Sequence, residues 1–371
     1  MTDVSQQLAR MMPAAAYTSE EVLAWERRHL FAGTWTCLGL VEDLFPEGVR
    51  QRAVMVGDIS CLVVRDGDSY EMFANTCRHR GHELLPDGQT SDRRLISCPY
   101  HAWTYDLEGE LKGAPGFRDV PGFDKHEHAL VPLPLTIWHG WIFGHALNPL
   151  TGPGDPLVPA FHQHVGELDR VLAPYRPGSL VLADRHTYEV AANWKVIAEN
   201  YHECYHCPQI HPELCEVSPP ESGDNYDLPG SWVGGMMDLR DGMATMSLTG
   251  ELAATPIPGA PTRTVEYVHL LPNLLISAHP DYVMTHRMVP LAPGRTWVEC
   301  SWLVLPDAGP AAAAVEFWDI TNRQDWAACE SVQRGLGSPH FTPGPFAPNE
   351  DAVAHLVSLI GAAYREGGLE L

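Results

Sequence analysis

The stretches CRH at residues 77–79 and CPYH at residues 98–101 decide how the first half of this 371-residue chain folds. The first reads C-x-H and the second C-x-x-H, and each lies on a turn between predicted strands. Two thiolates suit one iron and two imidazoles suit the other iron of a two-iron cluster. The predicted ligands of one metal centre are therefore Cys77, His79, Cys98 and His101.

This mixture of ligands is the Rieske arrangement of a [2Fe–2S] cluster, whose neutral imidazoles raise the reduction potential above that of an all-cysteine cluster. A structural zinc ion is the alternative, because two cysteines and two histidines also bind zinc. Zinc-finger spacings usually keep like ligands together, whereas each half of this motif mixes the two types. The pattern therefore favours the cluster. We interpret His82 as a histidine beside the ligands or on the surface.

Short β-rich runs separated by turn pairs such as Gly57-Asp58 and Asp66-Gly67 surround the motif and predict an all-β block. The predicted strands are 54–56, 59–65, 70–74, 94–97, 103–106 and 136–144. Residues 147–159, which are rich in proline and glycine, predict a linker.

Helices and longer strands make up the rest of the chain. A T-x-x-E capping box at Thr18 and Glu21 predicts a helix over 20–31. The region 208–262 reads as loop. Further predicted helices are 193–206, 311–336 and 351–365, and the predicted strands are 180–190, 264–270, 273–278, 283–290 and 295–304. This order predicts an antiparallel sheet with helices.

Charge and composition exclude several classes of protein. With 47 acids against 24 bases the formal net charge is −23, which repels nucleic acid. No apolar run is long enough for a membrane span, and the N-terminus lacks the features of a signal peptide, so we expect a cytoplasmic protein. Clustered cysteines in that compartment are more often metal ligands than disulfides.

A second metal site is predicted in NWKVIAENYHECYHCPQIHP, residues 193–212. On a helix, Glu199, His202, Glu203 and His206 share one side. Pro208 should end that helix and let His211 return towards His206. Two imidazoles so placed are good ligands for a divalent metal.

The third ligand is expected from the helix predicted over 311–336. Its apolar stripe consists of Trp318, Thr321, Cys329, Val332 and Leu336, with the carboxylate of Asp325 at its centre. Burying a bare carboxylate is costly, and a bound metal relieves that cost. His206, His211 and Asp325 would then form a two-histidine, one-carboxylate triad with positions left open for dioxygen and substrate.

Three alternatives stay open from the residues alone. His202 and His206, at i and i+4, also suit a metal pair. Cys204 and Cys207 form a C-x-x-C, but no βαβ pattern supports a redox motif, and we interpret them as separate packing cysteines. In a shorter helix, Asp325 would be a terminal or solvent-bridging residue.

The blocks CRHRG…CPYHAWTYDLEGEL and NWKVIAENYHECYH resemble the α subunits of Rieske non-haem iron oxygenases, over nearly the whole chain. The resemblance implies an α+β fold, in which an all-β Rieske domain (35–150) is inserted in a helix-grip, START-like catalytic domain (1–34 and 151–371). It implies a cluster bound by Cys77, His79, Cys98 and His101, and iron bound by His206, His211 and Asp325. RQDWAACESVQRG (323–335) is similar to the branch that acts on glycine betaine and carnitine.

The same resemblance implies a homotrimer. Many family members have Asp at the position of Glu203, where it bridges to a cluster histidine of the neighbouring subunit; here the residue is Glu, as in the carnitine-type members. The matching histidine is His101, and within one chain cluster and iron would lie too far apart for electron transfer. Asn200 is expected beside the iron ligands.

The expected partners are dioxygen, a small organic substrate and a reductase or ferredoxin that delivers electrons, ultimately from NAD(P)H. We expect a local basic patch to dock this donor, although scattered solvated charge is the alternative. The basic residues in or near the cluster loops are Arg78, Arg80, Arg93, Arg94 and Lys112.

Three functions compete. The first is a monooxygenase that hydroxylates or demethylates a quaternary or N-methyl amine, with cage candidates Tyr226, Trp232, Tyr267 and Trp297. The second is an aromatic-ring hydroxylase, whose pocket the methionine-rich stretch 232–248 would line unless it is simply core. The third is a Rieske electron carrier with a binding domain, which would need no open iron.

Overall fold

The computed structural model describes residues 8–148 and 158–371, and these divide into two compact units. One unit comprises the described residues up to Trp25 together with 163–371, and the other comprises residues from Glu26 to His162. The second unit therefore interrupts the first along the sequence. Most of the predicted linker 147–159, and the predicted domain boundary after residue 150, lie outside the described residues.

The unit of residues 26–162 is built from three small antiparallel sheets. The meander β2 (Gln51–Val56), β3 (Ile59–Asp66) and β4 (Ser69–Ala74) follows the predicted runs and lies in a five-stranded sheet with β5 (Thr90–Ser91) and β9 (Pro132–Leu133). The other sheets are β1 (Thr36–Leu40), β11 (Trp141–Gly144) and β10 (Leu135–Trp138), and β6 (Ile96–Ser97), β7 (Thr104–Tyr105) and β8 (Leu111–Gly113). This unit also carries α3 (Val41–Leu44) and η2 (Lys125–His128).

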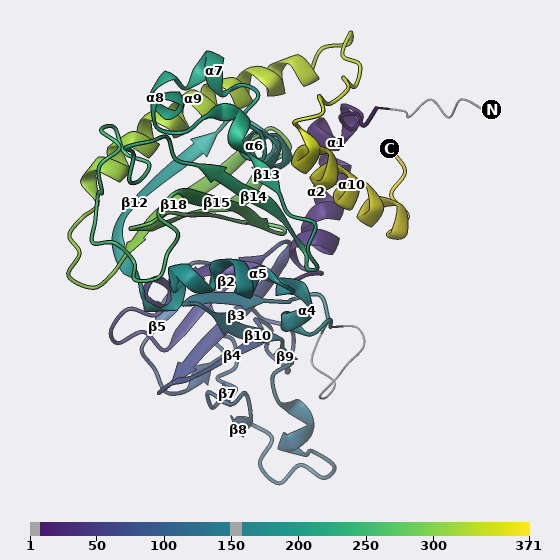
Figure 1. Ribbon diagram of the computed structural model, residues 1–371. Helices are drawn as coiled ribbons and strands as arrows, with labels where there is room; N and C mark the ends of the chain where they lie inside the picture. The colour runs from purple at the N-terminus through teal and green to yellow at the C-terminus, as the bar shows by residue number, and fades with distance from the viewer. Residues whose placement is uncertain (1–7, 149–157) are drawn as a thin grey trace. The chain divides into compact units, whose positions relative to one another are not determined.

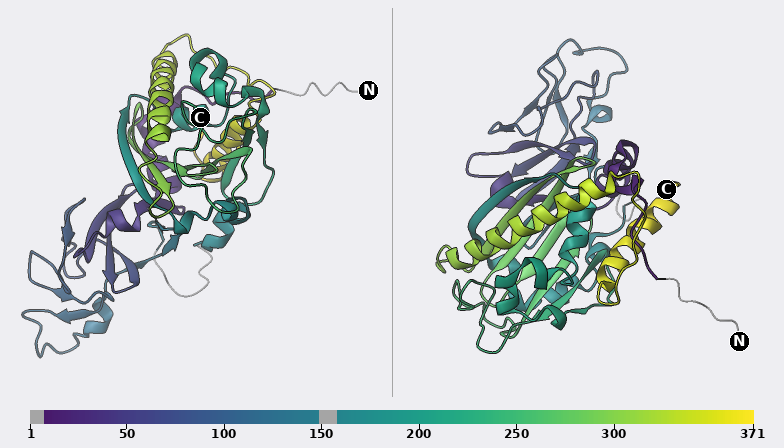
Figure 2. Two further views of the ribbon diagram at one scale, coloured as in Figure 1. Left: turned by 60° about the vertical axis from the view of Figure 1, so that its left-hand side comes forward. Right: turned by 90° about the horizontal axis from the view of Figure 1, so that it is seen from above.

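A seven-stranded antiparallel sheet forms the centre of the other unit (Figures 1 and 2). In spatial order its strands are β12 (Val181–Val190), β18 (Arg295–Val304), β17 (Val283–Ala292), β16 (Leu274–Ala278), β15 (Thr264–Leu270), β14 (Trp232–Asp238) and β13 (Asp224–Asn225). Sequence reasoning missed β14 and β13. Gly234 and Gly235 made β14 hard to predict, because glycine is uncommon inside strands. The pairing with β15 nevertheless requires glycine, since a Cβ at Gly234 would lie 2.2 Å from the Tyr267 carbonyl oxygen.

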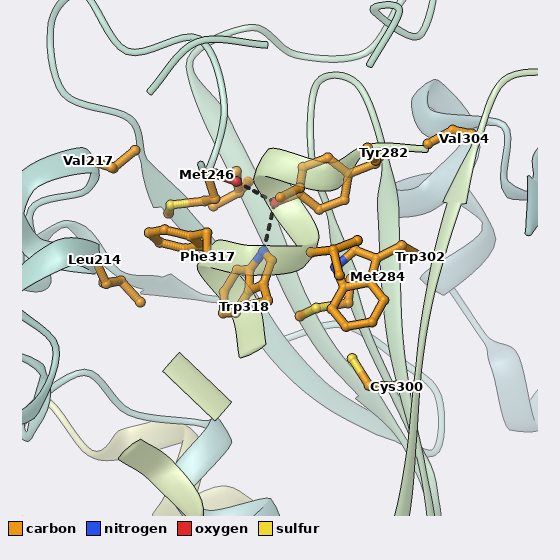
Figure 3. Packing of buried hydrophobic residues seen from close by; sticks show 14 of the residues in the cluster. Leu214, Val217, Met246, Tyr282, Met284, Cys300, Trp302, Val304, Phe317 and Trp318 are labelled. Atoms are coloured by element: carbon orange, nitrogen blue, oxygen red, sulfur yellow. Dashed lines mark hydrogen bonds between the residues drawn. The ribbon is translucent and has the colours of Figure 1, made fainter. Parts of the chain in front are cut away.

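The long helix α9 (Ala312–Leu336) lies along one face of this sheet (Figures 1 and 2). Its Phe317 and Trp318 pack among Met284 and Trp302 of the sheet and Tyr282, which directly precedes β17 (Figure 3). The Trp318 indole N–H donates to the Tyr282 hydroxyl at 2.7 Å, which donates to the Met246 carbonyl at 2.7 Å. Both buried donors therefore have an acceptor, and these two hydrogen bonds hold α9 in its position over the sheet.

Shorter helices complete the unit. They include α5 (Leu168–Leu172), α6 (Trp194–Tyr201), α7 (Cys207–Ile210), α8 (Pro212–Val217) and α10 (Asp351–Glu366). The helix α4 (Phe161–Val165) spans the division between the units. α6 contacts both α9 and α10. No helix in the described part of the chain is long and apolar enough to cross a membrane.

The predicted N-terminal helix over 20–31 has the expected bounds but differs in its last turn and in its cap. α1 (Ala15–Thr18) precedes α2 (Glu20–Glu26), and the turn Arg27–Phe31 is a π-helix. The predicted Thr18 cap is wrong: the Thr18 hydroxyl donates to the Ala14 carbonyl, and the Ser19 hydroxyl oxygen accepts from the Val22 N–H at 3.3 Å. Ser19 is one residue closer to the first turn and is the better placed N-cap.

A buried carboxyl on β15 makes the stability of this unit depend on pH. Burial raises the pKa of Glu266 to about 7, although the Tyr226 hydroxyl donates to its Oε2 at 2.9 Å. The folded-state pKa of Glu266 lies above the unfolded value. Its contribution to the free energy of unfolding is therefore fully present below about pH 4.5 and is lost as the pH rises towards 7.

We therefore expect Glu266→Gln to be more stable than the wild type at pH 8 by about 1–3 kcal/mol and nearly equal to it at pH 4.5–5. Thermal unfolding midpoints at both pH values measure this, with the exposed Glu251→Gln as the matched control. A difference that does not change with pH would contradict the assignment.

Candidate active site

The helix that leads into the site is shorter than predicted. α6 begins at Trp194, where the Asn193 side-chain oxygen accepts from the Lys195 N–H at 3.0 Å, and ends at Tyr201 instead of residue 206. Pro208 does not end this helix; it lies in the first turn of the next helix, α7, where its missing N–H costs nothing. The predicted face shared by Glu199, His202, Glu203 and His206 therefore does not exist.

The one-turn helix α7 brings two histidines together. His206 is its N-terminal cap and His211 its C-terminal cap, so one turn of backbone separates them. Their Nε2 atoms lie 3.2 Å apart. The two histidines thus lie close together, as the sequence predicted. The reason is a helical turn between them, whereas the prediction relied on Pro208 ending a helix.

Asp325 of α9 meets both imidazoles. Its Oδ1 lies 2.9 Å from His211 Nε2 and 3.3 Å from His206 Nε2. Ligands held at about 2.1 Å and at right angles around one metal ion are about 3 Å apart, so these three atoms are spaced as neighbouring ligands on one face of an octahedron. The donor set of two nitrogens and one carboxylate oxygen fits a ferrous ion.

Other side chains orient these three groups. His211 Nδ1 donates to Gln324 Oε1 at 2.7 Å, and His206 Nδ1 is hydrogen-bonded to Glu203 Oε1, so both rings turn Nε2 towards Asp325. Asn200 Nδ2 donates to Asp325 Oδ1 at 2.7 Å. Gln324 was missed by sequence reasoning, although its position next to Asp325 was an available signal.

The electrostatics of the site favour a charged pair in the absence of metal. Burial alone would lower the pKa of His206, but hydrogen bonds with Asp325 and Glu203 raise it to about 9. Burial alone would raise the pKa of Asp325, but hydrogen bonds with His206 and His211 lower it to about 2. Asp325 is therefore ionised, as a metal ligand must be.

Neighbouring residues have other partners. The His202 ring stacks on His269 at 5.7 Å, away from the three groups, which removes the alternative His202–His206 pair. Glu199 accepts from the Tyr17 hydroxyl at 2.7 Å. Cys204 and Cys207 form a disulfide, so the prediction of separate packing cysteines is wrong.

A cavity of about 230 Å³ opens beside the three groups, and five rings line it in addition to those of His202, His206 and His211. Centroid distances join them into a continuous arc: Trp318 to Tyr267 at 6.4 Å, Tyr267 to Tyr201 at 6.0 Å, Tyr201 to His286 at 6.3 Å and His286 to Trp326 at 6.1 Å. We call these five residues the aromatic arc. The cavity is smaller than drug-sized pockets, which span several hundred cubic ångströms, so its volume suits a small ligand.

Most of the proposed cage residues lie elsewhere. Of the four, only Tyr267 lines the cavity. Trp232 is buried in β14, Tyr226 bonds to Glu266, and Trp297 lies under the Arg287 guanidinium. In the methionine-rich stretch Met236 and Met237 line the cavity, whereas Met246 belongs to the core.

The two cluster loops in the other unit share one hydrogen-bond pattern. The Cys77 N–H donates to the His82 carbonyl at 2.9 Å and the Cys98 N–H to the Trp103 carbonyl at 2.8 Å. Each cysteine carbonyl accepts from the residue four positions on, Gly81 or Ala102, and both of these have positive φ. Two matching loops therefore present two cysteines and two histidines.

The side chains on these loops fit a [2Fe–2S] cluster. The His79 and His101 ring centroids lie 4.7 Å apart, and His79 stacks on Trp103 at 4.8 Å. His79 Nδ1 is buried and has no hydrogen-bond partner in the described part of the chain, which suits an atom reserved for a metal. The Tyr105 hydroxyl lies 3.4 Å from Cys77 Sγ.

Comparison with known proteins agrees with this combination. Residues 34–124 match the Rieske [2Fe–2S] domain, and residues 178–366 match the catalytic domain of the ring hydroxylating alpha subunit. The chain therefore belongs to the Rieske non-haem iron oxygenases, which are enzymes with a Rieske cluster and a mononuclear iron.

Two relatives in this family have assigned activities. The glycine betaine monooxygenase oxygenase subunit of Chromohalobacter salexigens is 30% identical over 91% of this chain and 81% of its own. The carnitine monooxygenase oxygenase subunit of Acinetobacter baumannii is 36% identical over 56% of this chain and 54% of its own.

The solved structure of the quaternary ammonium Rieske monooxygenase CntA with L-carnitine has a TM-score of 0.74 at 24% identity and covers 96% of both chains. Naphthalene 1,2-dioxygenase from Rhodococcus sp. has a TM-score of 0.72 at 22% identity and covers 96% of this chain and 94% of its own. These two likenesses establish the fold.

The Gln324 contact leads to a prediction about metal binding. Replacing Gln324 with Leu removes the acceptor that holds the His211 ring, and we expect affinity for mononuclear iron to fall about 10–100-fold. Iron content per chain after dialysis against graded chelator measures this, and the visible absorbance of the cluster should not change. Full iron retention at every chelator concentration would contradict the role of Gln324.

Proposed function

We propose that this enzyme oxidises a small quaternary or N-methyl amine. The observation that carries the proposal is the aromatic arc, which lines a cavity next to His206, His211 and Asp325. Aromatic faces attract ammonium groups, and quaternary ammonium ligands, which have no N–H to donate, are recognised in this way. The glycine betaine and carnitine monooxygenase relatives support the same substrate class.

The proposal assigns a role to each residue singled out in the sequence. His206, His211 and Asp325 hold the iron, and the cluster is held by Cys77, His79, Cys98 and His101. With both groups bound, the cluster supplies single electrons and the iron supplies dioxygen activation. Asn200 holds the Asp325 carboxylate, and the aromatic arc holds the ammonium so that a methyl group faces the three ligands.

The balanced reaction consumes one dioxygen, two electrons and two protons. One oxygen atom enters a C–H bond of the N-methyl group and the other leaves as water. With a quaternary substrate, the resulting carbinolamine breaks its C–N bond and releases formaldehyde, the demethylated amine and a proton; with a neutral N-methyl amine the hydroxyl proton moves to the amine nitrogen instead. The protein's contribution is to orient the methyl group and to exclude water with the apolar wall of Ile197, Leu214 and Leu275.

Single-turnover assays on chemically reduced enzyme test this proposal. We expect formaldehyde from a trimethylammonium substrate and weaker binding of its neutral tert-butyl isostere, because only the cation gains from the aromatic faces. A panel of methylated amines and aromatic acids supplies the comparison. A hydroxylated ring product without aldehyde would make the enzyme an aromatic-ring hydroxylase, and would overturn the amine assignment.

Glu203 is proposed as the coupling residue of a homotrimer. Its carboxylate bonds to His206 Nδ1, so it already contacts an iron ligand. A neighbouring subunit would place its cluster ligand, the counterpart of His101, on the other side of this carboxylate. The connection His101–Glu203–His206 would then join cluster and iron through two hydrogen bonds.

We expect Glu203→Gln to keep both metals and to lose at least about 100-fold in turnover, because the amide cannot accept at both ends. Steady-state oxidation is compared with metal content and with the rate of cluster reduction by dithionite. Glu203→Asp is the conservative control and should recover part of the rate. Unchanged turnover in Glu203→Gln would reject the coupling role.

The electron donor is proposed to dock near the cluster loops. Arg78, Arg80, Arg93 and Arg94 are exposed, and Arg80 lies over the Tyr100 ring at 5.5 Å. Lys112 is paired with Asp106 and is a weaker contributor. An acidic reductase or ferredoxin would be attracted to these arginines despite the negative net charge. A cytoplasmic location fits such a donor.

A further inference from the structure

The entrance of the active-site cavity is acidic. Four polar residues line its outer part, all of them exposed: Glu221, Asn225, Asn349 and Asp351. Asn225 Nδ2 donates to Asp351 Oδ1 at 2.7 Å, which ties the first residue of α10 to β13. The carboxylates of Glu221 and Asp351 therefore face a substrate on its way to the aromatic arc.

The lining of the cavity is poor in basic side chains. Among the described residues that line it there is neither lysine nor arginine. The stretches outside the described ranges, MTDVSQQ and PLTGPGDPL, contain none either. Deeper in the cavity the carboxylates of Asp325 and Glu203 formally balance the two charges of a ferrous ion. A carboxylate on a substrate would find no lysine or arginine among the described lining residues.

From this charge distribution we propose that the preferred substrate is a methylated ammonium cation that carries no carboxylate, and that Glu221 and Asp351 determine this specificity. The inference rests on the proposed amine oxidation and narrows it. Carboxylates at the mouth of a cavity attract a cation and repel an anion over several ångströms, more weakly when they are exposed, whereas a zwitterion gains at one end and loses at the other. The negative field of the whole chain acts in the same direction.

Choline and glycine betaine are a matched pair for testing this, since they share the trimethylammonium group and differ in hydroxymethyl against carboxylate. Isothermal titration of the metal-loaded enzyme gives dissociation constants, and steady-state formaldehyde or substrate-loss assays with the electron donor present give KM and kcat. For the wild type we expect choline to bind at least about tenfold more tightly than glycine betaine. Raising the salt concentration should narrow that ratio.

Neutralising the carboxylates at the entrance should change the affinities for the two ligands in opposite directions. We expect Glu221→Gln and Asp351→Asn each to weaken choline binding about threefold and to strengthen glycine betaine binding, with KM changed and kcat preserved. Glu221→Lys should reverse the preference. Glu216→Gln, an exposed acid on α8 away from the cavity, is the matched control and should change neither ligand.

Each result supports or overturns either the specificity assignment or the proposed amine oxidation. Tighter binding of glycine betaine by the wild type, or equal weakening of both ligands in the variants, would overturn the specificity assignment while amine oxidation stands. Binding of neither ammonium compound, together with turnover of an aromatic acid, would overturn the proposed function itself. Opposite shifts for the two ligands support the proposal, because a general structural defect would move both the same way.

Discussion

The buried carboxylate of Asp325 is the constraint on which the rest of the structure depends. It sits on α9 and accepts contacts from two histidines of a different segment, so its position is useful only if α9 and α7 keep their separation. The Trp318–Tyr282–Met246 hydrogen bonds anchor α9 on the sheet two turns before Asp325. Packing far from the metal ligands thereby sets the geometry of the site.

The aromatic arc shows how one cavity collects residues from distant parts of the chain. Tyr201 comes from α6, Tyr267 and His286 from the sheet, and Trp318 and Trp326 from α9. Each element supplies one or two rings, so no local stretch of sequence contains a cage. A ligand held by all of them also stabilises the contacts between helix and sheet, because binding favours the arrangement in which all five rings are present.

Local patterns predicted the elements better than their ends and their side-chain partners. The strands at 264–304 and the helix at 311–336 followed from periodicity, and the spacing of the cysteine and histidine motif indicated the cluster. The end of α6 did not follow, because Pro208 is equally compatible with ending one helix and beginning another. Gln324 and the rings of the cavity depend on tertiary contacts, and glycines that pack against β15 obscured β14.

The interruption of one unit by the other has a consequence for synthesis. Tyr17 donates to Glu199, and the two are separated by 182 positions in the sequence. At translation rates of about 5–20 residues per second, α1 waits roughly 10–40 seconds before its partner leaves the ribosome. Residues 26–162 have emerged by then, whereas the buried Tyr17 and Val22 are exposed on a nascent chain. The apolar side chains of the N-terminal segment are thus open to chaperones and to misfolding throughout the synthesis of residues 26–162.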